Sequence, residues 1–139
     1  MNKKTYKTLE FNKVLEKLST YTQNDSVRER IAALEPSCDS NLVRAMLKET
    51  TEAAGILLRR GPSPGFKITD VTSAISRVER GGVMTMGELS KLSAGLNTCR
   101  RLKAYIEDDK ISEDTSVWGI SSTITNLKNV ENEINEKII

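Results

Sequence analysis

Basic side chains are the residues of this sequence whose type and spacing could do chemistry on a ligand. Two arginine pairs stand out, and the candidates for contact with a phosphate backbone are Arg59, Arg60, Arg100, Arg101 and Lys103, with Lys3, Lys4 and Lys7 as further basic residues. Helical surfaces carry such pairs routinely, and cations near a helix C-terminus also interact favourably with the helix dipole. Phosphate contact and ordinary surface charge both stay open, and we favour the second.

Other catalytic chemistry has little support in the residue types present. The sequence contains no histidine, which excludes Ser-His and Cys-His nucleophile pairs and histidine metal ligands. Cys38 and Cys99 have no neighbouring base, and we expect a loop residue and a small core residue, respectively. We therefore expect no catalytic residue in this chain.

Phosphate-binding loops and metal sites are equally unsupported. Gly61 to Gly65 and Gly81-Gly82 lack the lysine and hydroxyl residue of a nucleotide-binding loop, so we expect turns there. Acidic residues cluster without the ligand alternation of an EF-hand, and we expect a solvated turn at Glu107, Asp108, Asp109, Glu113 and Asp114. No metal site and no cofactor-binding residue are expected.

Length and composition fit one soluble helical domain spanning residues 1–139. Of the 139 residues 37% are hydrophobic and 4% aromatic, so aliphatic side chains must form the core, which favours helices over a β-sandwich. The 21 basic and 19 acidic residues are interleaved, with a net charge of +2. Two distant cysteines and the lack of a long apolar run favour the cytoplasm and argue against export or a membrane.

Apolar residues recur at intervals of three and four, which predicts an all-α fold: a multi-helix core or lever-type bundle of about six to seven helices without a substantial sheet. The first expected helix runs from Leu9 to Thr22 with Thr8 as its N-cap, and the second runs from a Ser26-Glu29 capping box to before Pro36. The third runs from Asp39 or Ser40 to Gly61, and the fourth from Asp70 to Gly81-Gly82. The last three run from a Thr85-Glu88 capping box past Ile106, around Val117 to Ile124, and through Leu127, Val130, Ile134 and Ile138.

The apolar stripes predict which side chains are buried. In the third helix these are Leu42, Val43, Met46, Leu47, Ala53, Ala54, Leu57 and Leu58, and in the helix after Thr85 they include Leu92 and Leu96. The C-terminal stripe allows two outcomes, folding back over the same chain or covering a second copy. We favour self-association, because a short terminal helix packed on one side has little stability of its own.

Ordered short motifs resemble the N-terminal core segment of the type-two MutS family, the Smr-bearing relatives of mismatch-repair MutS. They are Thr8-Leu9-Glu10-Phe11, Leu34-Glu35-Pro36, Glu49-Thr50-Thr51-Glu52-Ala53, Ile68-Thr69-Asp70-Val71, Arg80-Gly81-Gly82-Val83 and Glu88-Leu89. The resemblance implies a helical core, or lever, that links a clamp to a dimeric ATPase. It also implies that the ATP and Mg²⁺ sites and the Smr nuclease-type domain lie in other parts of a longer parent, together with the clamp.

The resemblance further implies partners that the residues alone do not indicate. They are the remaining domains of the parent, a second subunit of a homodimer, and branched DNA or stalled ribosomes reached through the parent. Two other functions stay open: a free-standing helical adaptor that receives a partner helix, and autonomous nucleic-acid binding through the basic pairs.

Overall fold

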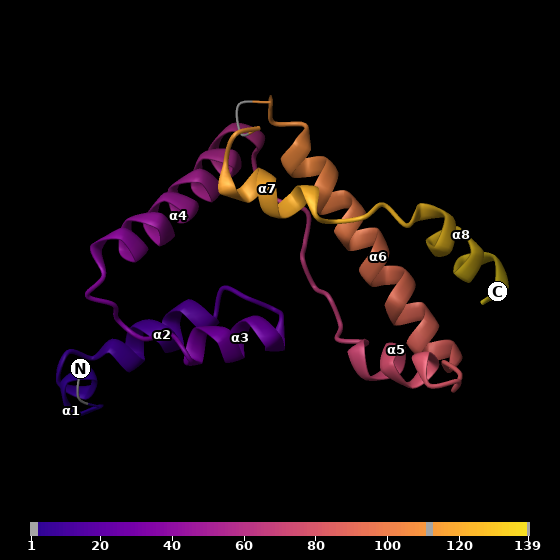
Figure 1. Cartoon of the computed structure of the whole chain (residues 1–139), viewed down its shortest axis with the longest axis horizontal. Helices are drawn as coiled ribbons and strands as arrows, with labels where there is room; N and C mark the ends of the chain where they lie inside the picture. Colours follow the sequence, from indigo (N-terminus) through magenta and orange to yellow (C-terminus); the bar gives the residue numbers. More distant parts are fainter. Residues whose placement is uncertain (1–2, 111–112, 139) are drawn as a thin grey trace. The chain divides into compact units, whose positions relative to one another are not determined.

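The computed structural model describes residues 3–110 and 113–138, and these ranges hold helices, turns and loops without a strand. The helices are α1 (Lys3–Thr8), α2 (Phe11–Ser19), α3 (Asp25–Ala32), α4 (Ser40–Arg60), α5 (Thr72–Glu79), α6 (Met86–Glu107), α7 (Ser116–Ser122) and α8 (Lys128–Lys137) (Figure 1). The all-α prediction is confirmed. Residues 1–43 and 44–139 form two compact units, so the single-domain expectation stays a prediction.

The first unit begins with two helices where the sequence predicted one. Thr8 is the last residue of α1 and not an N-cap, and α2 starts only at Phe11. Between them Glu10 has a left-handed backbone with φ of 55°, which stops one helix before the next begins. The predicted helix from Leu9 to Thr22 is therefore wrong at its start, because the hydrophobic period carries no signal for this break.

The start of α3 also differs from the prediction. Asn24 is the N-cap residue without a side-chain cap hydrogen bond, so the expected Ser26-Glu29 capping box is wrong. Arg28 reaches back to the helix start, where its guanidinium contacts Asp25 at 2.9 Å and donates to the carbonyl oxygen of Thr22 at 3.0 Å. This side chain holds the turn between α2 and α3, and α3 packs against α2.

Local signals set both ends of α4 as predicted. The Oδ1 atom of Asp39 accepts the backbone N–H groups of Asn41 at 2.9 Å and Leu42 at 3.2 Å, the pattern of an N-cap. Gly61 has φ of 78° directly after the last helical residue. The predicted register of α4 is wrong, because Leu47 and Leu58 are 61% and 87% exposed, while Ile56 is buried.

In the second unit, α5 and α6 begin where polar side chains accept backbone N–H groups. Asp70 Oδ1 accepts from the N–H of Thr72 at 2.8 Å, and Gly81 ends the following turn with φ of 86°. Thr85 and Glu88 form the predicted capping box at the start of α6. These helix starts follow directly from the sequence because their partners are within three residues of one another.

Helices α7 and α8 both pack against α6 (Figure 1). Ile134 of α8 and Ile106 of α6 are buried, so the C-terminal stripe covers this chain's own core, the less favoured of the two alternatives. Leu92 and Leu96 are half-buried and not buried as predicted, and Cys99 is half-buried as well. Hydrogen bonds between polar side chains also join α6 to α8.

Candidate functional site

Charged side chains tie the end of α4 to the end of α6. The Arg59 guanidinium donates two hydrogen bonds to Oδ2 of Asp109, from Nη2 at 2.7 Å and from Nε at 3.0 Å. Asp109 is only 5% exposed, so this ion pair is partly removed from water. The acidic turn was predicted to be solvated, and that prediction is wrong for Asp109, because its carboxylate is turned inward onto the arginine.

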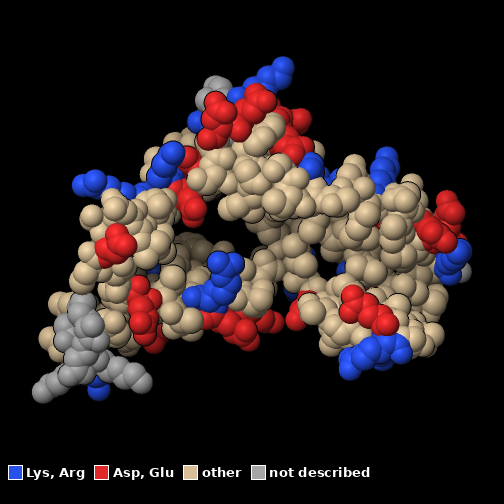
Figure 2. Space-filling model, viewed as in Figure 1, with Lys and Arg blue, Asp and Glu red and all other residues tan. Residues whose placement is uncertain are grey.

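A second arginine completes this connection. Arg60 Nη2 lies 3.1 Å from Asp108 Oδ2, and its guanidinium lies over the Tyr105 ring at 5.5 Å from the centroid. The Tyr105 hydroxyl donates to the carbonyl oxygen of Gly61 at 2.6 Å. We call the set Arg59, Arg60, Gly61, Tyr105, Asp108 and Asp109 the helix-end clasp. Acidic and basic side chains lie next to one another around the end of α6 in Figure 2.

The start of α7 is held by α4 as well. Glu52 Oε2 accepts the backbone N–H of Ser116 at 2.9 Å, and the Glu52 side chain is only 11% exposed. Thr115 caps the same helix by accepting the N–H of Trp118 at 3.2 Å. A carboxylate and a hydroxyl thus satisfy amides in the first turn of α7, where the helix dipole favours negative charge.

Polar side chains along one face of α6 hold α8. The carboxylate of Glu131 accepts from Asn97 at 2.7 Å and from Arg100 at 3.2 Å, and the Ser93 hydroxyl donates to Asn135 at 2.7 Å. The hydrogen bond from Arg100, and then the one from Asn97, lower the pKa of Glu131. Glu131 is buried, so these partners replace the water that an ionised carboxylate would otherwise need.

The five predicted phosphate-contact residues therefore have different surroundings. Arg59, Arg60 and Arg100 lie in the pairs described above. Lys103 donates to the carbonyl oxygen of Ile124 at 2.7 Å and lies 3.4 Å from Glu107, so it caps the end of α7. Arg101 is exposed, and the structure does not bring it together with the others into one surface. Whether any of these side chains contacts phosphate stays a prediction.

The acidic partners of these cations were not predicted from the sequence. Glu131 lies three residues before Ile134 and seven before Ile138, on the buried stripe of α8, so a charged residue at an apolar position was a usable signal. Ser93, Asn97 and Arg100 are separated by four and three residues, so they also share one face of α6. No comparable signal exists for Asp109, whose partner lies 50 residues away in the sequence.

These contacts join side chains of neighbouring helices to one another. Within residues 3–110 and 113–138, no group of three or more histidine, cysteine or acidic side chains could hold a metal ion. Every buried side-chain nitrogen or oxygen in the same ranges has a hydrogen-bond partner. None of the helices described there combines the length and hydrophobicity that a membrane span requires.

Comparison with known proteins places this arrangement in a family. The chain is 37% identical over 141 residues to Endonuclease MutS2 of Ruminiclostridium cellulolyticum, 36% over 141 residues to that of Acetivibrio thermocellus, and 34% over 140 residues to that of Clostridium novyi. Each alignment covers 100% of this chain and 18% of the relative. The chain is a segment of the MutS2 type.

The resemblance to the N-terminal segment of MutS2 that the short motifs indicated is thereby confirmed. No family model and no solved structure matches the chain. Because the chain spans 18% of the length of these MutS2 relatives, what a whole MutS2 protein does is a matter for proposal.

Proposed function

We propose that this chain acts as a non-catalytic helical core, or lever, segment of a MutS2-type dimeric ATPase. The helix-end clasp is the observation that supports it most directly. It joins the last residues of α4 to the two residues that directly follow α6, and Glu52 connects α4 to the start of α7. Side-chain ties at helix ends pass the movement of one helix to its neighbours, as a mechanical element requires.

The proposal assigns the chemistry to other parts of a MutS2 protein. ATP and Mg²⁺ bind in an ATPase domain outside these 139 residues, and this segment holds no cofactor of its own. The whole protein works as a cytoplasmic homodimer, without a membrane partner. It acts on branched DNA to restrain recombination, or on stalled ribosomes. The name Endonuclease belongs to the relatives, and in our proposal their cleavage chemistry lies outside this segment.

A chimera tests the mechanical role. This chain replaces the matching segment of the Ruminiclostridium cellulolyticum MutS2, with which it shares 37% identity. We expect the chimera to hydrolyse ATP and to change its hydrolysis rate when branched DNA or ribosomes are added. Arg59→Ala in the chimera should leave basal hydrolysis unchanged and reduce the response to the added ligand, because the clasp is opened.

The matched control for that experiment is Arg101→Ala, which removes an exposed guanidinium from the same pair of helices without touching the clasp. The control should keep the full response. If Arg59→Ala responds like the control at equal folded fraction, the segment does not couple the two activities and the lever role is rejected.

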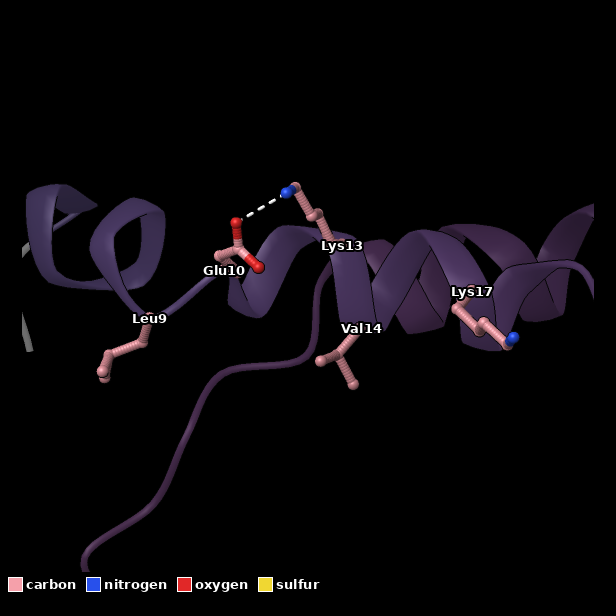
Figure 3. A pocket seen from close by; sticks show the side chains of 5 residues that line it. All are labelled: Leu9, Glu10, Lys13, Val14 and Lys17. Atoms are coloured by element: carbon pink, nitrogen blue, oxygen red, sulfur yellow. Dashed lines mark hydrogen bonds and ion pairs between the residues drawn. The ribbon is translucent and has the colours of Figure 1, made fainter.

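An adaptor that receives a partner helix is the second candidate, and α2 favours it. Val14 and Leu18 lie one helical turn apart on α2 and are 59% and 42% exposed, and Tyr21, two residues after the helix, is 76% exposed. Val14 also lines a shallow hollow of about 370 Å³ with Leu9 and three charged side chains (Figure 3). Val14→Lys should abolish the binding of an apolar helical peptide to the isolated chain if this function is correct, and an unchanged affinity would reject it.

A further inference from the structure

Gly55 lies inside α4, five residues before the end of the helix. Compared with alanine, a glycine in a helix interior lowers the folding equilibrium constant by about two- to fivefold. The backbone conformation does not require glycine here, because positive φ values occur at Gly61 and Gly81 and not at Gly55. What glycine offers at this position is therefore the space that a side chain would fill.

The side chain of Arg59 occupies that space. Side chains of an α-helix lean toward its N-terminus, so each lies over the residue four positions earlier. Arg59 stands four residues after Gly55. A Cβ atom on Gly55 would lie 3.0 Å from Nη1 of Arg59 and 3.8 Å from its Cζ. The guanidinium thus lies against the backbone of Gly55 on its way to the clasp.

Two hydrogen bonds hold the guanidinium in this place. Nη2 and Nε of Arg59 donate to Oδ2 of Asp109 at 2.7 Å and 3.0 Å. Because a guanidinium is planar and rigid, these two bonds also fix the position of Nη1. A methyl group at position 55 would push Nη1 away, and the bonds to Asp109 would lengthen with it.

The helix backbone has as little freedom to make room as the guanidinium. Ile56, the residue after Gly55, is only 3% exposed, so a shift of α4 at this point would disturb a buried side chain. Asp109 at the other end of the contact is 5% exposed. A displaced Arg59 would leave a buried carboxylate without its cation, which is costly.

We propose that Gly55 is a positioning residue for the helix-end clasp, because its missing side chain seats the Arg59 guanidinium against Asp109. A larger residue at position 55 should open this part of the clasp while every charged residue stays in the chain. The inference concerns the clasp itself and does not depend on the proposed lever function.

The alternative is that Arg59 moves aside by a few tenths of an ångström and keeps its bonds to Asp109. Alanine at position 55 would then add its ordinary helix stability. The two outcomes differ in sign, since the proposal expects Gly55→Ala to lower the folding equilibrium constant and the alternative expects it to rise by about two- to fivefold.

Urea denaturation followed by circular dichroism measures this sign. Gly119→Ala is the matched control, because Gly119 lies inside α7, is exposed, and a Cβ atom there would meet nothing within 4 Å. The control should move the urea midpoint upward, and Gly55→Ala should move it downward. A midpoint raised by Gly55→Ala overturns the proposal.

Removing Arg59 tests whether the effect of position 55 acts through that side chain. In the Arg59→Ala background the space over Gly55 is empty, so Gly55→Ala should now raise the folding equilibrium constant by about two- to fivefold. The effect of one substitution would thus change sign with the other, which is a direct coupling between the two residues. A loss of the same size in both backgrounds would place the clash elsewhere and overturn the proposal.

Nuclear magnetic resonance reads the hydrogen bond itself. The Nε–H group of Arg59 should give a signal protected from exchange with water in the wild type, assigned by its disappearance in Arg59→Ala. Gly119→Ala should keep this protection, and Gly55→Ala should lose it although Arg59 and Asp109 are both present. A protected Arg59 signal in Gly55→Ala would show that the seat is not needed and would overturn the proposal.

Discussion

Asp109 lies at the end of α6 with 5% of its surface exposed, and its carboxylate is held by the guanidinium of Arg59. A carboxylate removed from water costs free energy that only charged or polar partners offset. Asp108, one residue earlier, is exposed and pairs with Arg60 at the surface. The two neighbouring arginine–aspartate pairs should therefore contribute differently to stability, because Asp109 is buried and Asp108 is exposed.

This difference predicts the cost of opening the clasp. Arg59→Ala should lower the free energy of unfolding by about 1 to 3 kcal/mol, because it takes the cationic partner from a buried acid. Arg101→Ala, at an exposed position, should change it by less than about 0.5 kcal/mol. Urea denaturation followed by circular dichroism measures both. Equal effects would mean that the Arg59 to Asp109 pair contributes no more than surface charge.

Glu88 predicts how the stability of the fold changes at low pH. The hydrogen bond from Arg77, followed by that from the Thr85 backbone, lowers the pKa of Glu88 from 4.5 to about 2. A lowered pKa in the folded state means that the ionised carboxylate stabilises the fold above pH 4.5, and that this stabilisation is lost as the pH falls from about 4.5 to about 2.

Glu88→Gln isolates this contribution, since the amide keeps an acceptor for the Thr85 N–H but has no charge for Arg77. The wild type should be more stable than the variant at pH 7, and the gap should close as the pH approaches 2. Urea melts of both proteins at pH 7, 4.5, 3 and 2 follow the gap. A gap that stays constant with pH would contradict the ionic role of Glu88.

Among the helices, the starts of α4 and α6 were predictable from sequence because a cap needs partners only two or three residues away. Asp39 before α4 and Thr85 before α6 are such residues. Which side of α4 is buried was not predictable in the same way. Its apolar side was assigned to the core, yet Ile56 is the residue of α4 that is buried. The exposed Arg60 and Arg59 pair with acids 48 and 50 residues further along the chain.

The stability cost of removing a buried side chain on α8 can be compared with that of removing an exposed one on α4. Ile134→Ala should cost about 2 to 5 kcal/mol, because it leaves a cavity between α8 and α6. Leu58→Ala removes an aliphatic side chain that is 87% exposed and should cost less than about 0.5 kcal/mol in dilute, monomeric protein. Chemical denaturation at low protein concentration provides the comparison. A costly Leu58→Ala would show that its side chain is covered within the monomer.

At the scale of the molecule, the fold class and the family followed from periodicity and short ordered motifs, which need no distant contact. The division at residue 43 did not follow, since no proline or glycine cluster marks it and α4 runs through it. The candidate phosphate residues illustrate the same limit. The sequence shows that Arg59 and Arg100 are basic. Only the folded chain shows that Arg59 forms an ion pair with Asp109 and that Arg100 forms one with Glu131.

These pairs predict weak binding to nucleic acid. The net charge is only +2, and three of the five candidate phosphate contacts, Arg59, Arg60 and Arg100, each pair with an acid of the same chain, so the electrostatic attraction to DNA is weak. The isolated chain should bind duplex and four-way-junction DNA with a dissociation constant above about 1 μM at physiological salt. Fluorescence anisotropy over a salt series measures this. Tighter, sequence-selective binding would favour the autonomous nucleic-acid function.

The turn after α5 has a consequence for recognising related chains. A Cβ atom on Gly82 would lie 2.7 Å from Arg77 Cγ and 3.0 Å from the Arg77 carbonyl oxygen, whereas one on Gly119 would meet nothing within 4 Å. In a library of all substitutions selected for folding, position 82 should lose nearly every alternative and position 119 should keep many. A glycine at position 82 leaves room for the Arg77 side chain, whose guanidinium pairs with Glu88. We therefore expect related chains with this Arg77–Glu88 pair to have glycine at the matching position.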